Sequence, residues 1–121
     1  MKSGNEVLEL SFQFAVRIVN LCKYLKDEKK EYTLSKQLLR SGTSIGANVT
    51  EAQDAQSKKD FISKIAISLK EAKETRYWIS LLIETGYLPK DSKNVGSLQK
   101  ELESLISLLS AISISAKNRL Q

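Results

Sequence analysis

The chain has 121 residues, of which 41% are hydrophobic and 27% are charged, and its formal net charge is +5 at pH 7. This composition is typical of a single globular domain and excludes a disordered chain. A lone cysteine, Cys22, excludes a disulfide framework, and the absence of histidine removes the usual ligands of zinc and transition metals. We therefore expect no cofactor and no metal site.

The pattern of apolar residues also indicates where in the cell the protein is expected. No apolar run approaches the ~18 residues that a membrane-spanning helix needs. The opening residues, MKSGNEVLEL, lack the basic and then apolar layout of a signal peptide. We expect a cytoplasmic protein with no membrane partner.

The first expected helix covers about residues 5–29 and is unusually apolar. From Val7 to Leu25, 13 of 19 residues are apolar, which is more than one face of a bundle helix in a monomer needs. A surplus stripe indicates a subunit interface, and hence a homo-oligomer, although a wide core face in a distorted bundle is the alternative. We expect the first of two stripes in the core and the second left over: Leu8, Phe12, Ala15, Val19 and Cys22, then Leu10, Phe14, Ile18, Leu21 and Leu25.

The second expected helix, about 33–55, begins at a predicted N-cap, Thr33, and keeps two glycines, Gly42 and Gly46. Each glycine costs ~1 kcal/mol relative to alanine, so the pair indicates tight packing or a local kink. Polar side chains recur on one face of this helix, where a bundle helix usually places leucines. We expect this row to point inward and to join helices or protomers: Arg40, Ser44, Asn48 and Glu51.

The third expected helix, about 58–85, begins after Ser57, a predicted N-cap, and ends before Gly86. Folding it back on the second helix brings Arg40 level with Glu71 and Glu74. Because a buried guanidinium needs a carboxylate partner, we interpret these two acids as structural partners of the polar row rather than as general acids or bases. At helical spacing from Glu74, Trp78 is expected in the core.

The fourth expected helix, about 92–118, has the ordinary core pattern of leucines and isoleucines at three- and four-residue spacing. Four long helices joined by short loops predict one all-α domain over residues 1–121, an antiparallel up-down-up-down four-helix bundle. The core residues expected from this last helix are Leu98, Leu102, Leu105, Ile106, Leu109 and Ile112.

Two segments, RSGTSIGANVTEA from residue 40 and SKKDFISKIAISLKEAKETRYWISLLIETGYL from residue 57, carry a resemblance. They resemble the small four-helix-bundle proteins of intervening sequences in large-subunit ribosomal RNA genes, which often bear ribosomal-protein-like labels. The resemblance implies a left-turning bundle assembled into a ring, with a pentamer favoured. The chain is also similar to the accessory protein of diversity-generating retroelements, which implies binding of nucleic acid and a reverse transcriptase. The matching positions are Ser44, Ile45, Ala47, Asn48, Glu51, Phe61, Glu71, Glu74, Thr75 and Trp78.

Basic residues gather at both ends of the expected bundle. In a ring each group would be repeated around the axis, so a modest charge per subunit would become a substantial field for RNA or DNA. An ordinary solvated surface is the alternative that the sequence leaves open. One end collects Lys23, Lys26, Lys29, Lys30, Lys36, Lys90 and Lys93, and the other collects Lys58, Lys59, Lys117 and Arg119.

Together these patterns predict a non-enzymatic, oligomeric helical scaffold or binding module, with RNA or DNA as its ligand class. A protein-binding adaptor without nucleic-acid contact is the alternative. No nucleophile with an adjacent base is recognisable in the sequence, so we do not expect an enzyme.

Overall fold

A computed structural model describes residues 3–120, with side chains from residue 6 to residue 119. Over this range the chain forms four α-helices and no strand, so the predicted all-α four-helix bundle is confirmed. Every helix end lies within two residues of its predicted place. The helices are α1 (Ser3–Asp27), α2 (Thr33–Gln53), α3 (Lys58–Glu84) and α4 (Lys93–Leu120).

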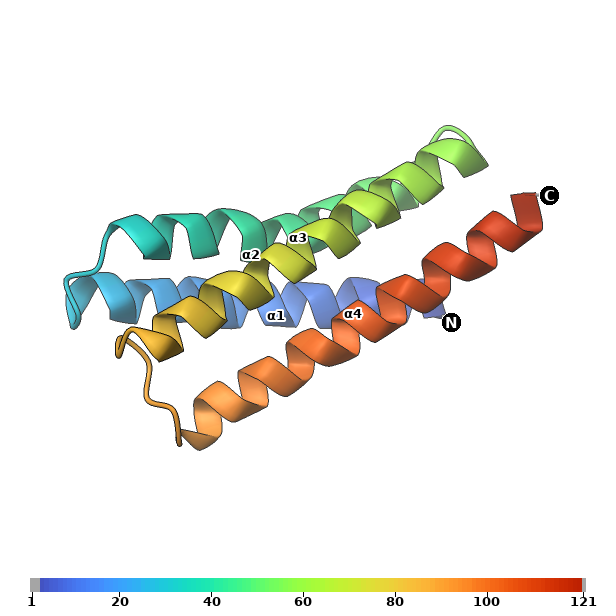
Figure 1. Cartoon of the computed structure of the whole chain (residues 1–121). Coiled ribbons are helices and arrows are strands. Elements are labelled where there is room, and N and C mark those ends of the chain that lie inside the picture. The colour runs from blue at the N-terminus through green and yellow to red at the C-terminus, as the bar shows by residue number, and fades with distance from the viewer. Residues whose placement is uncertain (1–2, 121) are drawn as a thin grey trace.

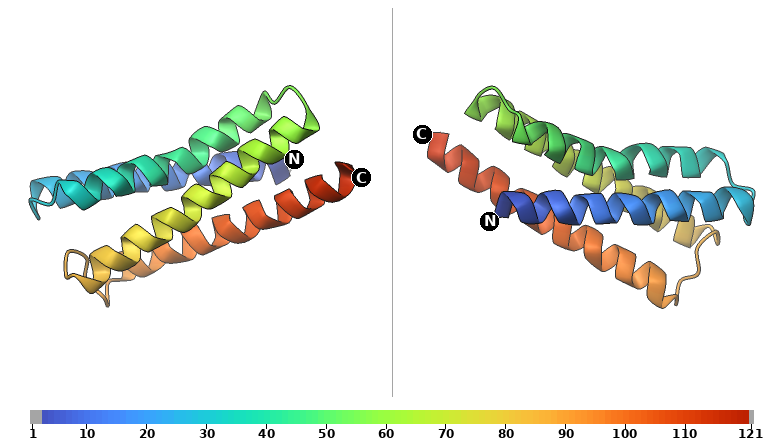
Figure 2. Two further views of the ribbon diagram at one scale, coloured as in Figure 1. Left: turned by 45° about the horizontal axis from the view of Figure 1, so that its top comes forward. Right: turned by 180° about the vertical axis from the view of Figure 1, so that it is seen from behind.

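The helices run alternately up and down, with the α1–α2 and α3–α4 loops at one end and the α2–α3 loop at the other (Figure 1). Each helix packs against its neighbours in the chain, and α1 also touches α4. The contact between α2 and α3 is the most extensive and that between α1 and α4 the least. Towards the α3–α4 loop, α4 diverges from α1 (Figures 1 and 2).

A single core runs between the helices, built from one apolar stripe of each. Five of the six core residues predicted on α4 are buried, and Ile112 packs against the core while half-buried. Trp78 was predicted to lie in the core. Its ring packs against the core but is only half-buried. The largest fully buried side chains include Phe14, Ile18, Leu25, Leu38, Ile45, Ile65, Ile79, Leu82, Leu102, Leu105 and Leu109.

The surplus stripe on α1 is present, but the two stripes have exchanged the roles expected from the sequence. Phe14 and Ile18 are fully buried, whereas Phe12 is 62% exposed and Val19 is 36% exposed. Of the stripe expected inside, only Cys22 is buried. The small side chain of Ser11 lets α1 approach α2 closely at that position, which turns Phe12 outward. The apolar side chains on the side of α1 that stays at least partly exposed, here called the α1 stripe, are Leu8, Phe12, Ala15, Val16 and Val19. Of these, Leu8 and Ala15 are half-buried, and Leu8 also packs against the core.

The glycines of α2 lie where α1 passes closest. A β-carbon at Gly46 would stand 3.2 Å from the carbonyl oxygen of Ser11, and one at Gly42 would meet the side chain of Ile18. Both glycines therefore allow tight packing between α1 and α2, which is the first of the two explanations drawn from the sequence.

The residues at both ends of α3 and at the start of α4 are of types that commonly end or begin helices. The Ser57 hydroxyl accepts a hydrogen bond from the backbone N–H of Asp60 at 3.0 Å, which confirms the predicted N-cap of α3. Gly86, with φ of +86°, follows the last turn of α3 in the left-handed conformation that glycine favours. At the start of α4 the Ser92 hydroxyl accepts from the N–H of Val95 at 3.3 Å.

The cap of α2 differs from the prediction. Thr33 is the first residue of the helix, and the residue before it makes no side-chain cap. Instead the buried carboxylate of Glu31 accepts hydrogen bonds from the backbone N–H groups of Thr33 (3.3 Å), Leu34 (3.0 Å) and Ser35 (2.7 Å). Glutamate can act in this way because Lys30, with φ of +55°, reverses the chain and aims the following residue at the helix N-terminus.

Candidate functional site

The predicted partnership of Arg40 with Glu71 and Glu74 is present at the seam between α2 and α3. Arg40 Nη1 donates to Glu71 Oε1 at 3.2 Å, and Nη2 donates to Glu74 Oε2. The same Glu74 oxygen accepts from the indole N–H of Trp78 at 3.0 Å. The hydrogen bonds from Trp78 and then Arg40 lower the pKa of Glu74, and the bond to Glu74 raises the pKa of Arg40.

The inward orientation expected for this row is wrong. The Arg40 side chain is 50% exposed, and its partners Glu71 and Glu74 are 15% and 30% exposed. Because successive residues of a helix are turned by about 100°, burying Ser41 and Ile45 leaves their neighbours at the edge of the interface. The seam is therefore a polar border that screens the core, not a buried network.

The remaining members of the row do not join the arginine. The Ser44 hydroxyl donates to the carbonyl of Arg40 at 2.6 Å, and the Asn48 amide donates to the carbonyl of Ser44 at 2.8 Å, so both bond within α2. Glu51 pairs with Lys64 of α3 at 3.0 Å, and this contact raises the pKa of Lys64. The predicted network thus divides into one cluster around Glu74, one separate ion pair and two local hydrogen bonds.

No structural role was predicted for the buried hydroxyl groups beneath the seam, and Thr75 was named only as a position of the family resemblance. Ser68 donates to the carbonyl of Ile45 at 2.8 Å, and Thr75 donates to the Ser41 hydroxyl at 3.0 Å. The sequence feature that could have revealed them is the helical spacing of small residues on α3, namely Ser68, Ala72 and Thr75, which lets α2 approach closely. Among the side chains described, no buried polar atom lacks a partner, so the hydroxyls fix the register of the two helices and are already satisfied.

All eleven basic residues predicted to bind nucleic acid lie on the surface. Within residues 6–119 none of them belongs to an ion pair, because the pairs present involve Arg17, Arg40, Lys64 and Arg76. The group of seven, here called the lysine end, lies around the α1–α2 and α3–α4 loops (Figure 1). Acidic residues lie among these lysines: Glu31 is buried as the cap of α2, whereas Asp27, Glu28, Glu84 and Asp91 are exposed.

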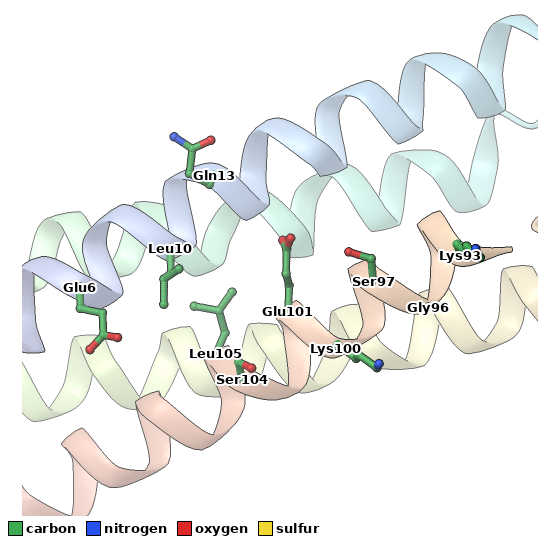
Figure 3. A pocket seen from close by; sticks show the side chains of 10 residues that line it. All are labelled: Glu6, Leu10, Gln13, Lys93, Gly96, Ser97, Lys100, Glu101, Ser104 and Leu105. Atoms are coloured by element: carbon green, nitrogen blue, oxygen red, sulfur yellow. The ribbon is translucent and has the colours of Figure 1, made fainter.

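A groove between α1 and α4, with a volume of about 840 Å³, was not predicted from the sequence. Leu10 of α1 and Leu105 of α4 point toward one another across it, with Glu6 at one end and Lys93 at the other (Figure 3). The α4 wall between these two ends combines the small residues Gly96, Ser97 and Ser104 with Lys100, Glu101 and Leu105. The helices diverge here because small side chains and one exposed leucine leave the space between them unfilled.

One ion pair joins α1 to α4 beside the groove. Arg17 of α1 donates to Glu101 at 2.6 Å, to the Ser97 hydroxyl at 3.1 Å and to the Asn94 carbonyl at 3.1 Å. Arg17 thereby pairs with Glu101, whereas Lys93 and Lys100, which also line the groove, form no ion pair among residues 6–119.

Among the residues that the structure describes, no group of three histidine, cysteine, aspartate or glutamate side chains is placed to hold a metal ion. No helix in this described part is long and apolar enough to span a membrane.

Comparison with known proteins identifies a family and a similar solved structure. The model of the 23S rRNA-intervening sequence protein family matches residues 3–111. A crystal structure of a protein of unknown function from the S23 ribosomal protein family of Bacteroides thetaiotaomicron is similar, with 50% sequence identity and a TM-score of 0.89. The alignment covers 93% of this chain and 98% of that one. Among curated proteins, none matches the chain.

Proposed function

The chain belongs to the 23S rRNA-intervening sequence protein family, and from this premise we propose that it is a non-enzymatic, homo-oligomeric binding module whose lysine end contacts RNA or DNA. The observation that carries the proposal is the set of seven exposed lysines around two loops at one end of the bundle, none of which has an ion-pair partner among the residues described. Flexible ammonium groups of this kind neutralise phosphates without reading sequence.

Oligomerisation supports this role because it would multiply the charge. A ring brings copies of the lysine end around one axis, and phosphate contacts made in parallel add to affinity as avidity. The α1 stripe supports association, since a monomer rarely leaves such a row of apolar side chains in water. A ring of five copies is the assembly that the family resemblance favours.

The nucleic-acid proposal is tested by fluorescence anisotropy with labelled single- and double-stranded RNA and DNA across a salt series. We expect affinity to fall steeply with salt. Changing Lys23, Lys26, Lys29 and Lys30 to glutamine should lower the slope of log K against log salt by about 3, at 0.7–0.9 per lost phosphate contact. The matched control changes the four basic residues of the opposite end, Lys58, Lys59, Lys117 and Arg119.

The two quadruple variants separate the possible outcomes. A change confined to the Lys23–Lys30 variant supports binding at the lysine end. An equal effect of the control shows that the opposite end takes part, and the assignment to one end is then wrong. Absence of binding by the wild-type protein at low salt contradicts the proposal as a whole.

A protein-binding adaptor is the second candidate, and the exposed apolar α1 stripe favours it. If the stripe does not join copies of this chain, it offers a surface for a different protein, such as a reverse transcriptase. Light scattering at micromolar concentration distinguishes self-association from binding of a different protein. If the wild-type protein is an oligomer and Phe12→Ser makes it a monomer, the stripe joins copies of this chain. A monomeric wild-type protein would contradict the oligomer and leave the adaptor.

A further inference from the structure

Two exposed aromatic rings lie among the lysines of the lysine end. Tyr24, in the last turn of α1, is 39% exposed, and Tyr32, which immediately precedes α2, is 60% exposed. Tyr87 belongs to the same end of the bundle, but its ring packs against the hydrophobic core. Tyr24 and Tyr32 therefore present aromatic surface that the core does not take up.

The reversal of the chain between α1 and α2 brings these two tyrosines near each other. Lys30, with φ of +55°, turns the backbone, and the N–H of Glu31 donates to the carbonyl of Leu25 at 2.9 Å. Tyr24 and Tyr32 are each next in the chain to one member of this bonded pair, so their α-carbons lie within roughly 14 Å of each other. Because Leu25 and Glu31 are buried while both tyrosines are exposed, one short strand can reach both rings from the solvent.

The segment that carries the rings is basic, although acids are interleaved with its lysines. Residues 23–36 contain five lysines and three acids, which gives them a net charge of +2. The carboxylate of Glu31 is held by the N–H groups at the start of α2, whereas Asp27 and Glu28 are exposed. All five lysines are exposed, and none has an ion-pair partner among residues 6–119. A modest charge attracts a polyanion of either form, so the rings decide which form gains a further contact.

Aromatic side chains beside lysines favour a single strand over a duplex. In a duplex the faces of the bases are stacked on one another, and a protein meets only phosphates, sugars and base edges. In a single strand the bases can be splayed apart, and each presents a face on which a tyrosine ring can stack. The lysines contact the phosphates of both forms, whereas the rings contribute only to the unpaired one.

We propose that the lysine end binds single-stranded nucleic acid, with one base stacked on Tyr32 and another base of the same strand stacked on Tyr24. The ammonium groups of residues 23–36 lie against its phosphates, and no base edge is read. This inference rests on the proposed binding of RNA or DNA and specifies the form of nucleic acid that is bound. Both RNA and DNA offer this chemistry when they are unpaired.

Binding of unpaired and duplex oligonucleotides to the full chain tests the proposal. Fluorescence anisotropy is measured with unstructured RNA and DNA strands of about eight nucleotides and with hairpin duplexes. Tyr24→Leu and Tyr32→Leu should each weaken binding of at least one kind of single strand by about tenfold and leave duplex binding unchanged. Neither removes a charge, so the slope of log K against log salt should stay at its wild-type value, in contrast to the quadruple lysine variant.

The variants are chosen to preserve the fold. Tyr32 makes no side-chain cap to α2, and the cap from Glu31 remains in Tyr32→Leu. Circular dichroism and light scattering should therefore match the wild type. Tyr32→Phe keeps the ring and should keep the affinity. The matched control is Tyr77→Leu, which removes a ring of similar exposure, 58%, from α3 outside the lysine end.

An abasic strand gives an independent readout of stacking. It keeps the phosphates but has no bases to stack, so the wild-type protein should bind it at least about tenfold more weakly than the normal strand. The double variant Tyr24→Leu/Tyr32→Leu should bind the two strands with equal affinity. Such a result shows that the two rings act on the bases and not on the phosphates.

The outcomes separate this inference from the proposed function. If the wild-type protein binds abasic and normal strands equally, or if neither tyrosine variant weakens single-strand binding, the stacking is overturned and binding of phosphates by the lysines still stands. An equal loss in Tyr77→Leu overturns the assignment to Tyr24 and Tyr32. A wild-type protein that binds no oligonucleotide at low salt overturns both proposals.

Discussion

Ile18 of α1 and Gly42 of α2 are packed so closely that a β-carbon built on the glycine would stand 2.8 Å from Ile18 Cγ2. Both residues are buried, and the β-branched isoleucine has little freedom to turn aside. The contact sets the distance between α1 and α2, and therefore decides which face of α1 reaches the core. One turn further along α2, the close contact between Gly46 and Ser11 fixes the helix separation in the same way.

We expect Gly42→Ala to destabilise the protein even though alanine favours helices by ~1 kcal/mol over glycine. Relieving the overlap requires α1 to move or Ile18 to leave its rotamer, at a cost of about 1–3 kcal/mol. Urea unfolding at one fixed protein concentration measures the net loss. Shortening the partner in the double variant Gly42→Ala/Ile18→Val should recover part of it, and a Gly42→Ala protein more stable than wild type would contradict the close packing.

Arg40→Ala tests the position of the polar seam. Because the guanidinium is half-exposed, its two carboxylate partners become solvated when it is removed, and we expect a loss of about 1 kcal/mol or less in unfolding free energy. Removing a buried arginine would instead cost about 3–5 kcal/mol, since its carboxylates would stay buried without a partner. A loss in that higher range would mean that the seam is enclosed in the assembled protein.

The pKa of Glu74 predicts a dependence of stability on pH. The folded protein lowers this pKa below its ordinary value of 4.5, through the hydrogen bonds from Trp78 and Arg40. The stabilisation is therefore present above about pH 4.5 and is lost as the pH falls toward the lower value of the folded state. The difference in unfolding free energy between wild type and Glu74→Gln should shrink over that interval. Trp78→Phe removes the first of the two hydrogen-bond donors, so the pH interval over which this difference changes should become narrower. A difference that does not depend on pH would contradict the lowered pKa of Glu74.

The fold was predictable from the sequence because strong, local signals specify it, whereas the details of the site depend on rotation about a helix axis. Four apolar patterns separated by caps and turns fixed the number, length and order of the helices. The pairing of Arg40 with Glu71 and Glu74 followed from counting levels along antiparallel helices. Counting levels does not say how far a helix is rotated about its axis. In α2 a rotation of one residue, about 100°, places Arg40 at the edge of the interface, and in α1 a rotation of two residues places Phe14 in the core instead of Phe12.

Two other features were beyond the reach of sequence patterns. Glu31 caps α2 from outside the usual set of N-cap residues, and its position depends on the left-handed backbone of Lys30. The α1–α4 groove arises from the divergence of two helices that are far apart in the chain (Figure 2). Neither has a motif, since each results from how neighbouring elements are placed in space.

Glu31→Ala tests how much the Glu31 cap at the N-terminus of α2 stabilises the protein. It leaves three backbone N–H groups at the start of α2 without their acceptor, and we expect a loss of about 1–2 kcal/mol in unfolding free energy. Hydrogen exchange should show faster exchange at Thr33, Leu34 and Ser35 than in wild type. Glu28→Ala, an exposed acid in the same turn, is the matched control and should leave both measurements unchanged.

Cys22 should be chemically silent in the folded protein. Its thiol is buried and donates to the carbonyl of Ser35 at 3.3 Å, and burial raises its pKa from the 9.0 of an exposed thiol to about 11. At pH 8 the thiolate fraction is then lower by on the order of 100-fold. DTNB should react with one thiol in guanidinium and with almost none in buffer, while Ser63→Cys in a Cys22→Ala background should react at once.

The same pKa has a consequence at alkaline pH. A folded-state pKa that is raised means that the unfolded chain ionises first, so the stability associated with Cys22 is present below pH 9 and is lost as the pH rises through about 11. Relative to Cys22→Ala, the wild-type protein should therefore lose unfolding free energy between pH 9 and pH 11. A constant difference across this interval, or rapid reaction of the native thiol with DTNB, would show that Cys22 is reached by water and that α1 and α2 separate at Ser35.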